Sequence, residues 1–184
     1  HAVEAALVMA VQQSGVLAPE VVTVLEDDDG IGTGYVMRRV MAEVNPAKIL
    51  AAPPPPSLIS ELGRELAKIH ALPLDKIPPA IPYMDVGEAL TALKERFIAY
   101  GGDRPIIALA IKWCEDHLPA PVPPGLVHSD YRMGNIMVDD QGLAAVLDWE
   151  LAHLGDGHED LAFGCMAVWR FGQLDKPAFG VGSL

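Results

Sequence analysis

Asp130, Asn135 and Asp148 are three possible oxygen ligands in the segment LVHSDYRMGNIMVDDQGLAAVLDWE, which runs from Leu126 to Glu150. Asp130 precedes Asn135 by five residues, and Asp148 follows Asn135 by thirteen. The intervening stretches IMV, DDQG and LAAVLDW predict two short strands joined by a turn. Such a hairpin would bring the three side chains to one edge of a small sheet. That arrangement suits Mg²⁺-dependent phosphoryl transfer, because hard Mg²⁺ prefers oxygen ligands.

Each of these side chains has a role in that chemistry. The run Gly125–Val127 predicts a short buried strand with Asp130 beyond its end, where the carboxylate could orient an incoming hydroxyl and accept its proton. Asn135 offers Mg²⁺ a neutral carbonyl oxygen, and Asp148 offers it an anionic one. Arg132 lies two residues after Asp130, where a cation could meet the transferring phosphate. Asp130 and Arg132 are therefore the candidate catalytic residues, and Asn135 and Asp148 the candidate metal ligands.

The simplest alternative is a surface loop between two ordinary strands. Asp and Asn are common in turns, and Asp139, Asp140 and Gly142 are expected to form only the turn of the hairpin. A plain turn does not explain the pattern HxDxxxxN followed, after a two-strand spacer, by a further Asp. The multi-part pattern favours the functional interpretation.

The histidines permit a second alternative, a metal-dependent hydrolase. His128, His153 and His158 occur at HxD and HxxxxH spacings beside acidic residues, which resembles a transition-metal site. That interpretation leaves Asn135 and the DWE segment without a function. His128 is therefore expected to be a packed, hydrogen-bonded residue that shapes the loop, and His153 and His158 are expected in an exposed loop.

The motifs HSDYRMGNIMV and VLDWELAHLGDGHEDLA resemble the catalytic core of the aminoglycoside phosphotransferase and choline kinase-like family, which are small-molecule relatives of protein kinases. The resemblance is greatest to the branch that includes kinase-like domains associated with acyl-CoA dehydrogenases. It implies that Asp130 is the catalytic carboxylate, that Asn135 and Asp148 hold Mg²⁺, and that the nucleotide is ATP or GTP. It also implies that Asp160 braces the catalytic loop from the start of a following helix.

Other segments extend the resemblance. The stretch EAALVMAVQQSGVLAPEVV is similar to the N-lobe helix and the strand after it, with Glu4 as a candidate partner for the nucleotide-binding lysine. The stretch GYVMRRVMAEV is similar to the last N-lobe strand and the hinge, where the backbone of Arg38, Arg39 and Val40 would bind an adenine edge. The stretch SLISELGRELAKIHALP is similar to the first long helix of the C-lobe.

The resemblance implies an α+β, protein kinase-like bilobal fold. A partial N-lobe is expected in residues 1–44, and a mainly helical C-lobe with the catalytic β-hairpin in residues 45–184. No segment matches the family's glycine-rich hairpin or its lysine-bearing strand, because Lys48, Lys68 and Lys76 all lie beyond the hinge. The chain is therefore expected to be truncated at both ends. A catalytically inactive kinase-like module that binds nucleotide or a partner is the alternative to an active enzyme.

Apolar spacing and Gly/Pro punctuation predict the remaining elements. Helices are expected at 2–14, from Ser57 onward, at 86–100 and at 104–118, and HEDLAFGCMAVWRFG is expected to close the chain as a helix. VVTVL and GYVMRRV are expected to form an antiparallel pair around EDDDGIGT. Glu61 and Glu65 are expected on a polar helix face. The residues expected to be buried are Phe97, Ile107, Trp113, Cys114 and Cys165.

The overall charge limits the possible partners. With 13 basic and 25 acidic residues, the net charge of −12 argues against binding to nucleic acid or to an anionic membrane. No apolar run approaches the length of about 20 residues that spans a membrane, and no targeting segment is evident, so the cytoplasm is the expected location. The expected partner is a small-molecule hydroxyl acceptor, either an aminoglycoside, another amino alcohol, a sugar or a hydroxyacyl thioester. The dehydrogenase-associated branch favours the last of these.

Overall fold

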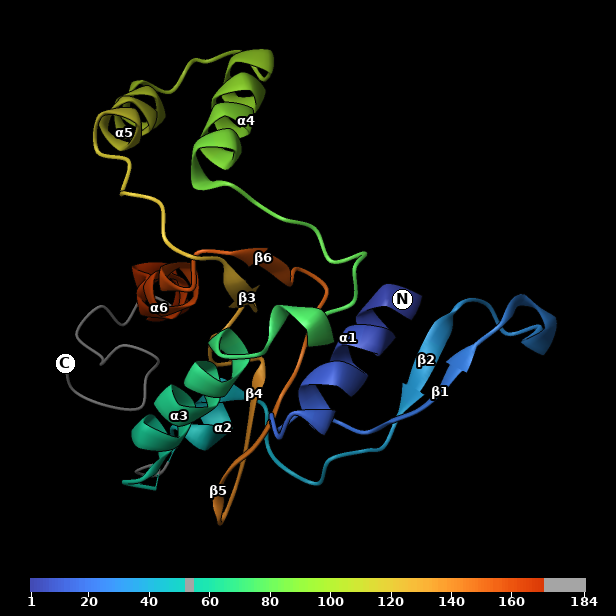
Figure 1. The fold of residues 1–184 in the computed structure, drawn as a ribbon. Coiled ribbons are helices and arrows are strands. Elements are labelled where there is room, and N and C mark those ends of the chain that lie inside the picture. The colour runs from blue at the N-terminus through green and yellow to red at the C-terminus, as the bar shows by residue number, and fades with distance from the viewer. Residues whose placement is uncertain (52–54, 171–184) are drawn as a thin grey trace.

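The fold was derived from a computed structural model, which describes residues 1–51 and 55–170 (Figure 1). Its helices are α1 (Ala2–Gln13), α2 (Pro46–Ile49), α3 (Leu58–His70), α4 (Val86–Ala99), α5 (Pro105–Asp116) and α6 (His158–Cys165). Its strands are β1 (Val21–Leu25), β2 (Gly34–Met37), β3 (Gly125–Val127), β4 (Ile136–Asp139), β5 (Gly142–Val146) and β6 (His153–Gly155). Short 3-10 helices cover Asp27–Asp29, Leu74–Lys76 and Ala167–Arg170.

The N-terminal part consists of α1 and the β1–β2 hairpin. Helix α1 buries residues at helical spacing, which gives it one apolar face: Ala5, Leu7, Val8 and Val11. It ends just before Gly15, whose φ of 84° is the left-handed conformation that favours glycine after a helix. Strands β1 and β2 pair antiparallel, from Val21↔Met37 to Leu25↔Gly34. The predicted helix and strand pair are therefore confirmed, although β2 ends at Met37 and leaves the residues expected to form the hinge outside the sheet.

The C-terminal part holds two further antiparallel pairs. Strands β4 and β5 form the predicted hairpin, whereas β3 pairs with β6. The β6 segment was expected to be an exposed loop, and that expectation is wrong for His153, which is only 1% exposed. Pairing of His153 with Val127 turns this segment into a strand and brings it into the interior. His158 is exposed as expected.

One apolar cluster joins the two parts, with members from α1, α3 and strands β3 to β5. A buried acid reinforces the junction. The Glu65 carboxylate accepts a hydrogen bond from the Leu17 amide beyond the end of α1, and Lys68 Nζ lies 2.8 Å from Glu65 Oε2 and 3.1 Å from the Gly15 carbonyl. The expectation of a polar helix face is therefore wrong for Glu65, which is 2% exposed, because its partner lies outside the helix.

Gly142 lies where the turn between β4 and β5 touches α3. Its φ is +125°, and a Cβ at this position would collide with the Glu61 carboxylate, which accepts the Leu143 amide at 2.8 Å. We expect Gly142→Ala to lower the free energy of unfolding by about 2–3 kcal/mol. The control Gly63→Ala sits at an exposed, open site on α3 and should raise the same quantity by about 0.5–1 kcal/mol. Denaturant unfolding measures the free energy of unfolding of both variants. A change of the same sign in Gly142→Ala and Gly63→Ala would contradict the prediction.

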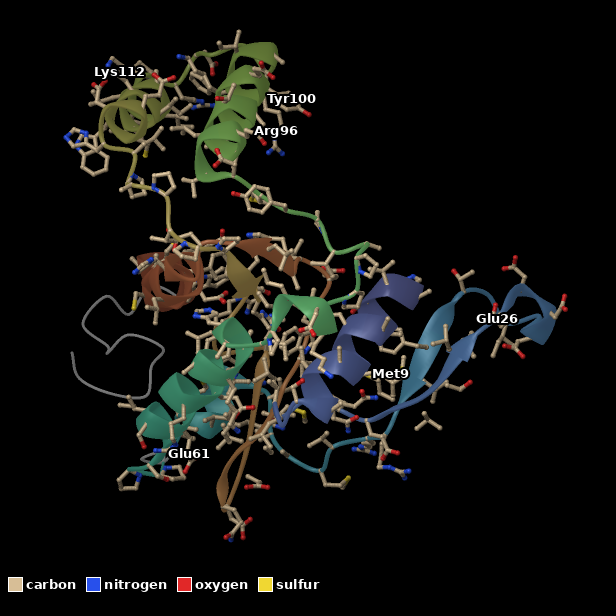
Figure 2. The ribbon with its side chains drawn as sticks, viewed as in Figure 1. Met9, Glu26, Glu61, Arg96, Tyr100 and Lys112 are labelled. Atoms are coloured by element: carbon tan, nitrogen blue, oxygen red, sulfur yellow. The ribbon has the colours of Figure 1, made fainter. Side chains whose placement is uncertain are left out.

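Helices α4 and α5 pack on each other and extend away from the rest of the molecule (Figure 1). An ion pair between Lys94 and Glu115, at 2.6 Å, joins them. Figure 2 shows Arg96 and Tyr100 on α4 and Lys112 on α5, and all three side chains are exposed. Among the helices of residues 1–51 and 55–170, none combines the length and the apolar character needed to cross a membrane.

Burial on these two helices differs from the sequence expectation. Ile107 is 43% exposed and Trp113 is 61% exposed, so the prediction that they belong to the core is wrong. Phe97 is partly buried. Cys114 and Cys165 are both exposed thiols, which corrects their expected burial. The physical reason on α5 is that its apolar residues surround the helix while the described contacts cover only one side.

Candidate active site

A buried carboxylate sets the shape of the HxD loop. Asp160, in the first turn of α6, is fully buried. Its Oδ2 accepts the His128 amide at 3.0 Å, and its Oδ1 accepts the Ser129 amide at 2.7 Å. His70 Nε2 lies 2.8 Å from the same Oδ2. The loop turns sharply here, since Ser129 has a φ of 70°, and the expected bracing by Asp160 is confirmed.

His128 fixes the next part of the loop. Its Nδ1 accepts the backbone amide of Asp130 at 3.2 Å, and its Nε2 donates to the Leu147 carbonyl at 3.0 Å. Burial lowers the pKa of His128, so the neutral ring with its proton on Nε2 is the form that satisfies both bonds. Both ring nitrogens are thereby engaged, which confirms the expected packed role and leaves no ring nitrogen for a metal.

The Asp130 carboxylate is held on both oxygens. Arg132 Nε donates to Oδ1 at 2.8 Å, and Asn135 Nδ2 donates to Oδ2 and, at 3.1 Å, to the Asp130 carbonyl. Asp130 is 8% exposed and Asn135 is 6% exposed. These bonds orient the carboxylate, and a carboxylate oxygen can still accept one more hydroxyl donor.

Asn135 precedes β4 and Asp148 follows β5, so both lie at the open end of the β4–β5 hairpin. The Leu147 amide donates to the Asn135 carbonyl at 2.8 Å, which places Asp148 one residue beyond this pairing. Asp148 is exposed and has a φ of 66°, an unusual backbone conformation that often marks functional positions. Because the Asn135 amide nitrogen is committed to Asp130, its side-chain oxygen is the atom suited to a metal. Two hard oxygen ligands fit Mg²⁺, which usually keeps water and phosphate as its other ligands.

A hollow of about 330 Å³ lies between the expected hinge and the β4–β5 hairpin. It is lined by Pro19, Met37, Arg38, Arg39, Val40, Ala42, Met137 and Leu147. Within residues 1–51 and 55–170, no hydrogen bond engages the Val40 amide or the Arg38 carbonyl. The Arg38 side chain instead pairs with Glu20, which lowers the pKa of Glu20 and raises that of Arg38. The hinge backbone therefore borders a hollow that is also lined by Leu147, the residue before Asp148.

Glu4 of α1 has a partner that the sequence did not indicate. Tyr35 on β2 donates its hydroxyl to Glu4 Oε1 at 2.7 Å. Burial, the bond to Glu4 and the nearby charge of Asp148 all raise the pKa of Tyr35. Tyr35 therefore lies close to both Glu4 and Asp148, and the charges of both carboxylates raise its pKa.

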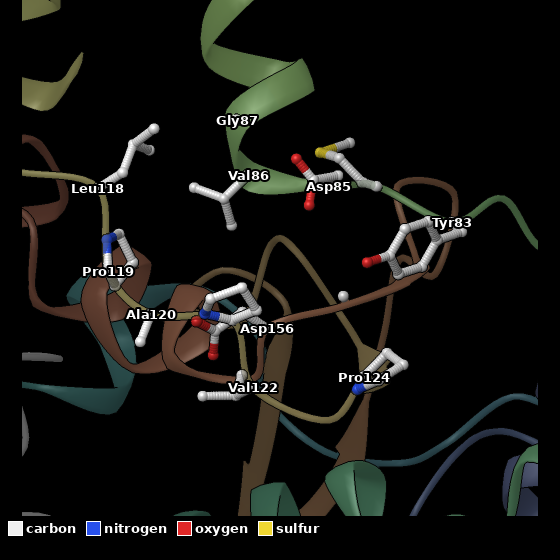
Figure 3. A pocket seen from close by; sticks show the side chains of 13 residues that line it. Tyr83, Asp85, Val86, Gly87, Leu118, Pro119, Ala120, Val122, Pro124 and Asp156 are labelled. Atoms are coloured by element: carbon white, nitrogen blue, oxygen red, sulfur yellow. The ribbon is translucent and has the colours of Figure 1, made fainter.

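A second hollow of about 170 Å³ lies beneath the start of α4 (Figure 3). Tyr83, Asp85 and Asp156 line it, together with the proline-rich segment 118–124. Both carboxylates are already used locally, Asp85 as the N-cap of α4 and Asp156 by the His158 amide. None of the candidate catalytic or metal-binding residues borders this hollow.

The Ser129 side chain contacts a pair formed by buried His153 and half-buried Glu159. The Ser129 hydroxyl donates to Glu159 Oε1 at 2.7 Å, and His153 Nε2 lies 3.3 Å from Glu159 Oε2. The bond to Glu159 raises the pKa of His153, and the bond to His153 lowers the pKa of Glu159. A raised histidine pKa adds stability that is fully present below about pH 6.5, the unfolded value, and is lost as pH rises through the folded value.

We therefore expect the stability gap between wild type and His153→Gln to shrink as pH rises from about 6 to 9. Glu159 stays ionised throughout this window, because its depressed pKa lies below it. Unfolding free energies at several pH values measure the gap. The control is His158→Gln, which removes an exposed histidine and reports the pH dependence that does not come from His153. A gap for His153→Gln that stays constant with pH would contradict the assignment.

The other residues that the sequence did not reveal reach the loop from a distance. His70 lies 90 residues before Asp160, and Trp169 places its ring over Arg132 at 4.2 Å. His70 lies in the segment SLISELGRELAKIHALP and Trp169 in HEDLAFGCMAVWRFG, but nothing in either segment indicated a contact with the loop. A local signal in this loop is Gly134, next to the candidate metal ligand Asn135, because the φ of Gly134, 112°, marks a backbone turn.

Comparisons with known proteins show the family and the fold of this chain. The phosphotransferase enzyme family model matches residues 2–181. Acyl-CoA dehydrogenase family member 10 of Mus musculus is 30% identical over 186 residues, which cover 92% of this chain but only 17% of that protein. A choline/ethanolamine kinase family protein from Mesorhizobium loti superposes with a TM-score of 0.67 at 21% identity, covering 100% of this chain and 60% of that one.

The GDP complex of wild-type aminoglycoside 2'-phosphotransferase-IIIa gives a TM-score of 0.66 at 14% identity, covering 88% of this chain and 60% of that one. The two structural matches confirm the predicted fold class, an α+β fold of the kinase-like type. Since the family model spans nearly every residue, this chain belongs to the phosphotransferase enzyme family.

Proposed function

We propose that this chain forms the nucleotide- and metal-binding core of an enzyme that transfers the γ-phosphate of ATP or GTP to a hydroxyl of a small molecule. The observation that carries the proposal is the hydrogen-bonded cluster of Asp130, Arg132 and Asn135. Leu147, which pairs with Asn135 and precedes Asp148, also lines the hinge hollow. The hollow would hold the base, with Val40 donating to it and Arg38 accepting from it. Residues 1–44 and 45–184 would then act as two lobes around the nucleotide.

Asp130 would accept the proton of the acceptor hydroxyl as its oxygen attacks the γ-phosphorus. The bond from phosphorus to the β–γ bridging oxygen breaks, and ADP leaves with that oxygen. Asn135 Oδ1 and the Asp148 carboxylate would hold Mg²⁺, which neutralises charge on the phosphate oxygens when bound. Arg132, already directed at Asp130, would meet the negative charge that gathers on the transferring group.

The acceptor class is proposed from the relatives rather than from the site. Aminoglycosides and choline or ethanolamine appear in the names of structural neighbours, whereas the curated relative named above is an acyl-CoA dehydrogenase family member. We favour a hydroxyacyl thioester, because the sequence identity to that relative, 30%, is higher than the 14% and 21% identity to the two structural neighbours. The net charge of −12 does not select among these acceptors.

Radiolabelled phosphate transfer from ATP tests the proposal. The full-length protein is incubated with Mg²⁺ and, in separate reactions, kanamycin, choline and a hydroxyacyl-CoA. The matching acyl-CoA without the hydroxyl is the control. Transfer to one hydroxyl-bearing compound and none to the control supports the proposal. Nucleotide binding without transfer to any acceptor would favour the inactive nucleotide-binding module instead.

A further inference from the structure

The guanidinium of Arg132 is held from several sides. Its Nε donates to Asp130 at 2.8 Å, its Nη1 donates to the Met133 carbonyl at 3.2 Å, and its Cζ lies 4.2 Å from the centre of the Trp169 ring. The side chain is 22% exposed, so these contacts are partly shielded from water. A cation over an aromatic face is attracted by the ring, and the attraction grows as water is removed.

The Trp169 ring is itself supported by α6. It packs against Phe163 with ring centres 5.2 Å apart and an interplanar angle of 46°. Its Nε1 is buried and has no hydrogen-bond acceptor among the residues that the structure describes. The contact that Trp169 makes toward the site is therefore through the face of its ring, not through its N–H group.

The loop leaves room for this arrangement. At Gly134 a Cβ would lie 2.5 Å from Arg132 Nη1, and the φ of 112° is one that other residues rarely adopt. The backbone of the catalytic loop thus passes directly beside the guanidinium. A larger residue at position 134 would push Arg132 out of the space between Asp130 and Trp169.

We propose that Trp169 is a positioning residue that holds Arg132 against the catalytic carboxylate Asp130. Helix α6 and the 3-10 helix after it then support the loop at two places. Asp160 fixes its backbone through the amides of His128 and Ser129, and Trp169 fixes the arginine side chain. The effect on turnover rests on the proposed phosphotransfer, whereas the hold on Arg132 can be observed without it.

The first test observes Arg132 directly, by nitrogen-15 NMR of the full-length protein. The Arg132 Nε–H signal is assigned as the one lost in Arg132→Lys. In Trp169→Ala we expect this signal to move, because the ring current is gone, and to exchange with water at least about fivefold faster, given the strength of a partly buried cation–ring contact. Trp169→Phe, which keeps an aromatic face, should restore most of the protection. Trp113→Ala, at an exposed tryptophan on α5, should change nothing.

The second test measures turnover with the acceptor that the phosphate-transfer assay identifies. We expect Trp169→Ala to lower kcat about fivefold to thirtyfold with little change in the KM for ATP, and Trp169→Phe to recover most of it. In the Arg132→Gln background the same Trp169→Ala change should have almost no further effect, because the residue through which it acts is absent. Equal losses in both backgrounds would overturn the positioning role.

The two tests separate the two proposals. An unchanged Arg132 signal in Trp169→Ala would overturn the hold on Arg132, whatever the turnover. A wild-type protein without transfer activity whose Arg132 signal still depends on Trp169 would contradict the proposed function and support the hold.

Discussion

Replacing Asp130 by Asn should reduce phosphate transfer by about two to four orders of magnitude while leaving Mg²⁺-nucleotide binding close to that of wild type. The amide keeps the shape of the side chain but cannot take the proton of the acceptor hydroxyl. It also presents an NH2 group to one of its two donor neighbours, Arg132 Nε or Asn135 Nδ2, so one of these bonds is lost. The nucleotide would contact other residues, chiefly around Val40 and Asp148.

Steady-state transfer rates and nucleotide calorimetry measure the two quantities separately. The matched control is Asp140→Asn, because Asp140 is an exposed carboxylate in the turn between β4 and β5. It removes the same charge from the hairpin that follows the Asp130 loop and should change neither quantity. A transfer rate in Asp130→Asn equal to that of the control would remove Asp130 from the catalytic role.

The largest loss of stability is expected at Asp160. Truncation to Ala leaves the buried amides of His128 and Ser129 without their acceptor and takes away the partner of His70. A buried charged group with several partners typically costs about 3–5 kcal/mol when one side is removed. We therefore expect Asp160→Ala to lower the free energy of unfolding by that amount, and transfer activity to fall with it because the HxD turn loses its support.

A second carboxylate calibrates this effect. Asp85 also accepts a backbone amide at the start of a helix, that of Glu88 at 3.0 Å, but it lies at the surface of α4 and accepts only one. Asp85→Ala should cost about 1 kcal/mol, as is usual for an N-cap. Denaturant unfolding of both variants under the same conditions makes the comparison, and a loss at Asp160 no greater than at Asp85 would show that the brace is not structural.

Local sequence patterns predicted the elements that neighbouring residues determine. Helix α1, the β1–β2 pair and the β4–β5 hairpin follow from apolar spacing and turn residues within a few positions of each other. The assignment of His128 as a packed residue also followed locally, because its Nδ1 bonds the amide just two residues later.

The features that the sequence did not predict depend on distant partners. Strand β6 has only three residues, and it exists because it pairs with β3, as in Leu126↔Leu154. Glu65 is buried because a backbone amide 48 residues away needs an acceptor. Trp169 reaches Arg132 from beyond α6. On α5 the error was the opposite one, since an apolar sequence predicted burial for side chains that the described contacts leave exposed.

The most direct test of the nucleotide–metal site is calorimetric titration of the full-length protein with ATP, with and without Mg²⁺, in wild type and Asp148→Ala. Asp148 is exposed and makes no hydrogen bond to the described residues, so the variant should fold normally, which circular dichroism would verify. We predict saturable ATP binding that requires Mg²⁺ in wild type and is at least about tenfold weaker in Asp148→Ala. ATP binding of equal strength in both proteins, or no dependence on Mg²⁺, would contradict the assignment of Asp148 and Asn135 as the metal edge of a phosphotransferase.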